Sequence, residues 1–179
     1  MPFELLDSEP LFKGRAFTIR RDRLKTPNGG ETRLDIVEHG GSVIILPVDA
    51  EGRLLFVRQY RHAAGLDLLE LPAGMREGQE PHAECAAREI REETGMAAHS
   101  LRRIGDFYLA PGYSTEFMAV FLATDLYAAP LQADADEFLE VVRVPVGAAL
   151  EMAAHGSVPD AKSLAALFLA RPELEKYLE

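Results

Sequence analysis

The sequence has 179 residues and a mass of 19.7 kDa, which suits one domain of ordinary size with a small appendage. Hydrophobic residues make up 47% of it and charged residues 27%, a balance that excludes a wholly disordered chain. Basic residues number 19 and acidic residues 29, so the net charge is −10. This charge disfavours non-specific binding to nucleic acids and to anionic membranes.

The single cysteine, Cys85, excludes an intramolecular disulfide and a cysteine-rich zinc site, and it is typical of reducing compartments. The first fifteen residues include acids and lack a long apolar stretch, and the apolar run 43–48 contains a proline. We therefore expect a cytoplasmic protein with neither a membrane nor a nucleic acid as partner.

Strand-like patterns and turn residues fill the first half of the chain. Turn residues at 27–30 and at 49–52 predict two hairpins. Pro72, Ala73 and Gly74 should then end regular structure and open a loop. The expected strands are 16–23, 32–38, 42–48, 53–60 and the leucine-rich stretch 66–71.

The clearest helix starts at Pro81 and stops at Gly95, because proline suits a first helical position and glycine the position after the last. Helical spacing sorts its side chains into arcs. The arc expected to pack on a sheet holds Ala83, Ala86, Ala87 and Ile90. A different arc holds Glu89, Glu92 and Glu93.

Strand patterns resume at 101–109, 117–122 and 139–144, and helical spacing covers 146–155, 161–170 and 172–178. Strands mixed with helices and joined by hairpins predict an α/β or α+β sandwich with a mixed sheet. A small antiparallel β unit at 1–38 should precede the main domain at 39–179.

Three carboxylates at i, i+3 and i+4 of one helix repel one another unless a cation lies among them. Because all the donors are oxygens, Mg²⁺ or Mn²⁺ is the expected ion. If the helix is considered alone, a solvated acidic face explains the three glutamates equally well.

A longer pattern surrounds these glutamates: Gly74, then Glu80 after five residues, then the run REIREETGM at 88–96. It resembles the Nudix box, Gx5Ex7REUxEExGU with U an apolar residue, at every defined position. Nine specified positions within 23 residues make agreement by chance very unlikely.

The resemblance implies a sandwich of the Nudix type and a metal-dependent hydrolase that splits the diphosphate of a nucleoside diphosphate linked to another group. More than one divalent cation per site is implied. Its metal ligands would be Glu89, Glu92, Glu93 and the backbone carbonyl of Ala73. Arg88 would orient a glutamate, and it joins Glu92 and Glu93 among the catalytic candidates, whereas Glu80 would brace the start of the helix.

Segments outside the box resemble the ADP-ribose pyrophosphatases: VRQYR at 57–61, ELPAG at 70–74 and APGYS at 110–114. Pro111 lies sixteen residues beyond Gly95, although Ala110 stands where this subfamily usually has serine. The resemblance implies hydrolysis of ADP-ribose to AMP and ribose 5-phosphate in a homodimer that exchanges its N-terminal sections. The alternatives are a broader nucleoside-diphosphate-sugar hydrolase and a non-catalytic nucleotide-binding module.

The candidate substrate-binding residues are Arg58, Tyr60, Arg61, Glu70, Pro111 and Gly112. Guanidinium groups at a strand end suit phosphate oxygens, but surface solvation explains each arginine equally well. Tyr60 suits stacking on adenine, although an aromatic residue at a strand end more often packs against protein.

A general base is also required, and similar enzymes carry it on the loop before the last strand of the sheet. That loop offers Glu137 and Glu140. We favour Glu137, because Glu140 lies inside an apolar run, and a solvated loop carboxylate remains the alternative for either.

Overall fold

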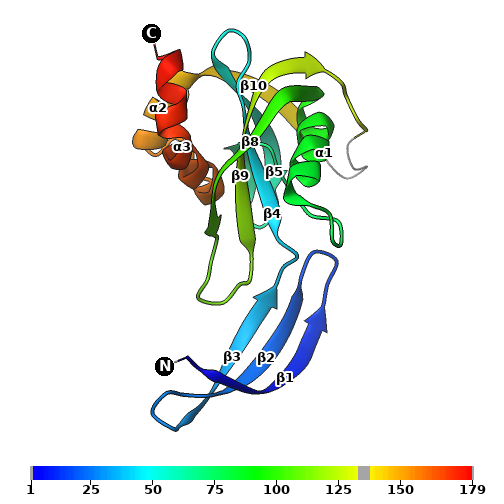
Figure 1. Ribbon diagram of the computed structural model, residues 1–179, viewed down its shortest axis with the longest axis vertical. Coiled ribbons are helices and arrows are strands. Elements are labelled where there is room, and N and C mark those ends of the chain that lie inside the picture. Colours follow the sequence, from blue (N-terminus) through cyan, green and yellow to red (C-terminus); the bar gives the residue numbers. More distant parts are fainter. Residues whose placement is uncertain (1, 133–137, 179) are drawn as a thin grey trace. The chain divides into compact units, whose positions relative to one another are not determined.

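The computed structural model describes residues 2–132 and 138–178 and consists of two compact units (Figure 1). The first unit comprises the chain up to Gly41 together with Phe107–Met118. The second comprises Ser42–Asp106 and the chain from Ala119 onward. We describe each unit separately.

The first unit contains three antiparallel strands, β1 (Glu4–Lys13), β2 (Thr18–Lys25) and β3 (Glu31–Glu38), in the order β1-β2-β3. The expected hairpin of β2 and β3 is present, whereas β1 was not expected from the sequence. Every residue of β1 is exposed, so this strand lacks the alternation of buried and exposed positions that reveals a strand.

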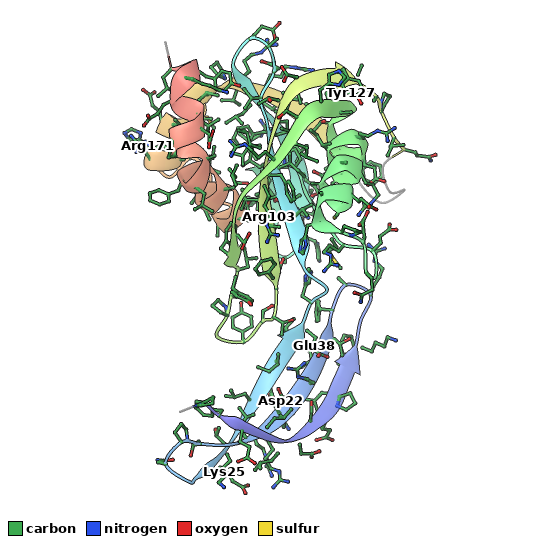
Figure 2. All side chains as sticks on the ribbon, viewed as in Figure 1. Asp22, Lys25, Glu38, Arg103, Tyr127 and Arg171 are labelled. Atoms are coloured by element: carbon green, nitrogen blue, oxygen red, sulfur yellow. The ribbon has the colours of Figure 1, made fainter. Side chains whose placement is uncertain are left out.

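A polar network links the strands of this sheet. Asp22 is buried and accepts hydrogen bonds from Ser8 Oγ, at 2.7 Å, and from Arg20 Nε, at 2.9 Å. Arg20 also pairs with Glu38 on β3, and Figure 2 shows Asp22 and Glu38 on their strands.

The second unit contains two sheets, in the orders β10-β5-β6 and β7-β4-β9-β8. Strands β8 and β9 continue into the first unit. The strands are β4 (Ser42–Pro47), β5 (Arg53–Arg61), β6 (Leu66–Glu70), β7 (Ala73–Met75), β8 (Met96–Tyr108), β9 (Phe117–Ala128) and β10 (Leu139–Pro145). The helices are α1 (His82–Thr94), α2 (Val146–Ala154) and α3 (Ala161–Leu174), and a short 3-10 helix, Glu175–Tyr177, follows.

Helices cover the strands of the second unit from two sides, as Figure 1 shows. Helix α1 contacts β4 and β7, and helices α2 and α3 contact β5, β10 and β4. The core lies between these layers: β4 is buried along its whole length, as are Leu54–Val57 of β5 and Met118–Ala123 of β9. The expected mixed α+β architecture is confirmed.

Strands β4 and β5 do not form the hairpin that was expected. They belong to different sheets and share only a bridge between Val48 and Leu54. Their apolar runs are buried on both faces, which is typical of strands that lie in the middle of separate layers.

The expected loop at 72–74 is partly a strand. Residues Ala73–Met75 form β7 and pair with β4, with Ala73 opposite Ile44. Leaving the backbone groups beside β4 unpaired would be costly, and this outweighs the local tendency of Pro72 and Gly74 to break regular structure.

Helix α1 begins and ends as expected, and Gly95 closes it with a φ of 72°. The expected buried face was wrong in part, because Ala83 and Ala87 are exposed. The buried residues are Cys85, Ala86, Glu89, Ile90, Glu93 and Thr94. Two glutamates therefore lie on the face that packs against the strands.

The C-terminal region contains one long helix where two were expected. Helix α3 continues through Pro172, which lies in its last turn and there removes a single backbone hydrogen bond. Among the described residues, the helices are too short or too polar to span a membrane.

Candidate active site

The chain turns from β6 toward α1 at Ala73 and Gly74, and two of the helix glutamates lie against this turn. Glu93 is only 6% exposed, and its Oε2 accepts a hydrogen bond of 3.0 Å from the backbone nitrogen of Ala73. Glu89 is 7% exposed and lies one helical turn before Glu93. Both carboxylates therefore face the same turn from the buried side of α1.

Gly74 leaves the space that the carboxylate of Glu89 fills. A Cβ atom at position 74 would lie 1.9 Å from Cδ of Glu89 and 2.0 Å from its Oε1, which is far closer than real contacts allow. The box glycine is thus explained by the close approach of Glu89 rather than by a special backbone angle.

Arg88 binds three of the carboxylates of the box. Its Nη1 donates to Glu89 at 2.7 Å and to Glu92 at 2.8 Å, and its Nη2 donates to Glu80 at 2.9 Å. Nη2 also donates to the carbonyl of Met75 at 3.0 Å, which connects the helix to the end of β7. Its partners, Glu80 first, raise the pKa of Arg88 and keep it charged.

Glu80 is fixed before the first turn of α1 by donors on both sides. It accepts from Arg88 Nε at 3.0 Å and from the backbone nitrogen of Glu77 at 3.1 Å. These hydrogen bonds, that from Arg88 above all, lower the pKa of Glu80 to about 2. The carboxylate therefore stays charged across the whole physiological range.

Cys85 lies on the same buried face as Glu89. Burial, reinforced by the charge of Glu89, raises the pKa of Cys85 to about 12, so the thiol stays protonated at neutral pH. Such a thiol packs as a small apolar group and is not a nucleophile.

Carboxylate oxygens are the ligands that Mg²⁺ and Mn²⁺ prefer, and Glu89 and Glu93 bring such oxygens to the backbone of Ala73 and Gly74. Glu92 lies on the same helix and is bound by Arg88. In the part of the chain that the structure describes, three acidic, histidine or cysteine side chains do not converge on one point. Arg88 instead supplies the positive charge to Glu89 and Glu92.

A second charged cluster lies on the β5–β6 edge of the site. Glu70 is 1% exposed, and Arg61 donates to it from Nε at 2.8 Å and from Nη2 at 2.7 Å. Glu70, followed by the charge of Glu93, raises the pKa of Arg61, so Arg61 lies within electrostatic range of the box glutamates. Burial alone would raise the pKa of Glu70, but Arg61 and Lys162 reverse this effect and lower it.

The N-terminus of α3 completes this second cluster. Lys162 donates to Glu70 and also, at 2.9 Å, to Asp160, which caps α3 by accepting from the backbone nitrogen of Ser163. The hydroxyl of Ser163 in turn accepts from the backbone nitrogen of Leu71 at 2.8 Å. The start of α3 is thereby connected to the segment that leads into the turn at Ala73 and Gly74.

The other residues expected on β5 lie on the opposite face of the strand. Side chains alternate along β5, so Arg61 shares a face with Glu70, whereas Arg58 and Tyr60 point to the other side. Arg58 pairs with Glu140 of β10 at 3.2 Å, and the ring of Tyr60 is largely exposed. Of these two arginines, only Arg61 thus lies on the face of the β5–β6 pair that includes Glu70.

The remaining candidates are Pro111, Gly112, Glu137 and Glu140. Pro111 and Gly112 are exposed residues of the first unit, in a segment joined to β3 by the hydrogen bond from Val37 N to Tyr113 O. Glu137 lies outside the described residues. Glu140, the alternative base, is an exposed residue of β10.

Sequence reasoning missed Asp160, Lys162 and Ser163. Asp160 directly precedes a predicted helix, and an aspartate in that position is an N-cap signal that the sequence alone provides. The partners of Lys162 and Ser163 lie 92 residues away along the chain, and a single sequence gives no signal for such contacts.

Comparisons with known proteins identify relatives of this chain. A model of the NUDIX domain matches residues 38–167. An ADP-ribose pyrophosphatase of Mycobacterium tuberculosis is 44% identical over 126 residues, which are 69% of this chain and 60% of that protein. An ADP-ribose pyrophosphatase of Bacillus subtilis is 36% identical over 89% of this chain and 87% of its own length. The crystal structure of an ADP compounds hydrolase superposes with a TM-score of 0.86 at 27% identity, covering 98% of this chain and 96% of its own.

Substituting Gly74 by alanine should displace the carboxylate of Glu89 and weaken binding of Mn²⁺ by about tenfold, measured by isothermal titration calorimetry. Gly40→Ala is the control, because a Cβ at position 40 meets nothing within 4 Å. An unchanged affinity for Mn²⁺ in Gly74→Ala would contradict the placement of Glu89 in the metal site.

The low pKa of Glu80 predicts a pH-dependent contribution to stability. The carboxylate stabilises the fold at any pH above its ordinary pKa of 4.5, and this contribution is lost as the pH falls toward 2. Urea unfolding in EDTA should show Glu80→Gln less stable than the wild type at pH 7 by up to about 3 kcal/mol, with the gap shrinking below pH 4.5 and closing only near pH 2. Glu84→Gln, on the exposed side of α1, is the control. A gap that is constant with pH would rule out the charge of Glu80 as its cause.

Proposed function

This chain belongs to the NUDIX domain family, and from that premise we propose that it hydrolyses ADP-ribose to AMP and ribose 5-phosphate. The observation that carries the proposal is the set of carboxylates on α1, with Glu89 and Glu93 held against the turn at Ala73 and Gly74. The relatives named ADP-ribose pyrophosphatase support the choice of substrate.

Glu89, Glu92, Glu93 and the carbonyl of Ala73 would hold Mg²⁺ or Mn²⁺, with more than one ion per site. When bound, these cations supply positive charge to the diphosphate and lower the pKa of a water molecule. Arg88 keeps the glutamates in place and limits their mutual repulsion. Glu137 is our proposal for the base that accepts the proton of the attacking water.

Arg61 is our proposal for the group that binds the phosphate oxygens of the substrate. It lies on the same face of the β5–β6 pair as Glu70, and the negative charge of Glu93 contributes to raising its pKa. Glu70 serves by holding Arg61 rather than by touching the substrate, because both of its oxygens already accept hydrogen bonds from the protein. Tyr60 is exposed on the other face of β5 and is a weaker candidate for contact with adenine.

We also propose that the protein acts as a cytoplasmic homodimer. A free, buried cysteine is typical of a reducing compartment. The sheet of the first unit exposes large apolar side chains on both faces, Leu5 and Leu34 on one and Phe12 on the other. Exposed apolar side chains of this kind suit an interface, and a second copy of the chain is the partner that we propose.

Product analysis tests the reaction directly. Purified protein with Mg²⁺ should convert ADP-ribose to AMP and ribose 5-phosphate, with slower turnover of ADP-glucose, GDP-mannose and NADH. Glu93→Gln should reduce turnover at least about 100-fold while the melting temperature changes little, because a ligand is lost but the shape is kept. Glu84→Gln, on the exposed face of the same helix, should be fully active.

Faster hydrolysis of another nucleotide sugar would refute ADP-ribose as the preferred substrate and leave the metal chemistry standing. Normal activity of Glu93→Gln would refute the metal-ligand assignment itself. A wild type that splits none of these compounds with Mg²⁺ or Mn²⁺ would favour a nucleotide-binding module.

Light scattering tests the dimer. The wild type should have twice the mass of the 19.7 kDa chain, and Phe12→Glu should shift it toward the monomer, because Phe12 is 55% exposed on the sheet of the first unit. Phe168→Glu is the control, since Phe168 is 78% exposed on α3 in the second unit. A wild type that is monomeric at micromolar concentration would exclude the proposed homodimer.

A further inference from the structure

Glu70 is the least exposed carboxylate among the described residues and has two cationic partners, Arg61 and Lys162. A buried carboxylate needs compensation, but the bidentate pair with Arg61 already supplies one full positive charge. The second cation is therefore not explained by the need to neutralise Glu70 alone.

The geometry of the guanidinium shows which part of Arg61 is left for a ligand. Nε and Nη2 lie along one edge of the plane, and both donate to Glu70. Nη1 lies on the opposite edge and makes no hydrogen bond within the described part of the chain. The Arg61 side chain is 40% exposed, so this second edge is accessible.

The charges of the cluster alternate along a chain of contacts from Arg61 through Glu70 and Lys162 to Asp160. Asp160 caps α3, and its Oδ2 accepts from the nitrogen and the hydroxyl of Ser163 as well as from Lys162. Because Ser163 shares in stabilising that oxygen, Lys162 can also direct its charge to Glu70. Part of the charge of Arg61 then remains for an anion on its exposed edge.

We propose that Lys162 is a positioning residue that acts through Glu70 to hold Arg61 ready for the phosphate groups of the substrate. This inference rests on the proposed hydrolysis of a nucleoside diphosphate sugar. Lys162 is 14% exposed, with its ammonium group bound to two carboxylates, so direct contact with substrate is not its role.

Removing the charge of Lys162 would change the cluster from neutral to a net charge of −1. Arg61 would then be the sole cation beside Glu70, and its attraction for a substrate phosphate would fall. The metal ligands on α1 would be unaffected. The loss should therefore appear in substrate binding and in KM, with little change in kcat.

A double-mutant cycle between Lys162 and Arg61 tests this proposal. Binding of ADP-ribose is measured by calorimetry in EDTA, where there is no turnover, and KM and kcat are measured separately with Mg²⁺. Lys162→Met and Arg61→Met should each weaken binding about tenfold, whereas adding Lys162→Met to Arg61→Met should cost less than about twofold more.

Two variants separate positioning from a structural role. Lys162→Arg keeps the charge and should stay within about threefold of the wild type. Lys162→Gln keeps a hydrogen-bond donor on a slightly shorter side chain but loses the charge, so it should weaken binding as Lys162→Met does. It decides the question if the methionine variant fails to fold. Lys176→Met is the matched control, because Lys176 is an exposed lysine near the C-terminus that lies beside Tyr177.

Equal losses from Lys162→Met in the wild-type and Arg61→Met backgrounds would overturn the inference, and so would wild-type affinity in Lys162→Gln. Either result with an active wild type would leave the proposed function intact. A wild type that neither binds nor splits ADP-ribose or another nucleoside diphosphate sugar would overturn the proposed function and the inference together.

Discussion

Carboxylates on the buried side of a helix are stable only beside positive charge, and the region around α1 depends on how Arg88 meets this constraint. One planar guanidinium reaches Glu80, Glu89, Glu92 and the carbonyl of Met75 at the same time. A lysine has a single donor atom and cannot bridge acceptors spread over the helix and the preceding loop. Because Arg88 is present, α1 can turn glutamates rather than alanines toward the strands.

In both charged clusters of the second unit, cations stabilise buried carboxylates, but the net charges of the two clusters differ. Around α1, one arginine faces three carboxylates, with Glu93 beside them, and this excess of negative charge favours a divalent cation. Around Glu70, two cations and two anions alternate and the sum is zero. Under the proposed function, the negative cluster would hold the cations and the neutral cluster would offer Arg61 to the diphosphate of the substrate.

The sequence predicted most of the central elements, because their signals are local. The ends of α1 follow from Pro81 and Gly95, and the box residues from their spacing. The predictions that were wrong concern features that depend on tertiary structure. Strands β4 and β5 belong to two sheets instead of one hairpin, and β7 forms because it pairs with β4. That Arg58 and Arg61 lie on opposite faces follows from strand alternation, since they are three residues apart. The role of Lys162 could not be predicted from local sequence, because its partner Glu70 lies 92 residues earlier.

Because Lys162 lies 92 residues after Glu70, the two are synthesised at different times. Arg61 and Glu70 lie on paired neighbouring strands, so they can meet soon after both leave the ribosome. Lys162 and Ser163 are synthesised much later, and until then Glu70 lacks its second cation and the backbone of Leu71 lacks its hydroxyl acceptor. A nascent chain would therefore carry the whole box and still lack the support of α3. Under the proposed function, full affinity for a nucleotide would arise only after α3 has been synthesised.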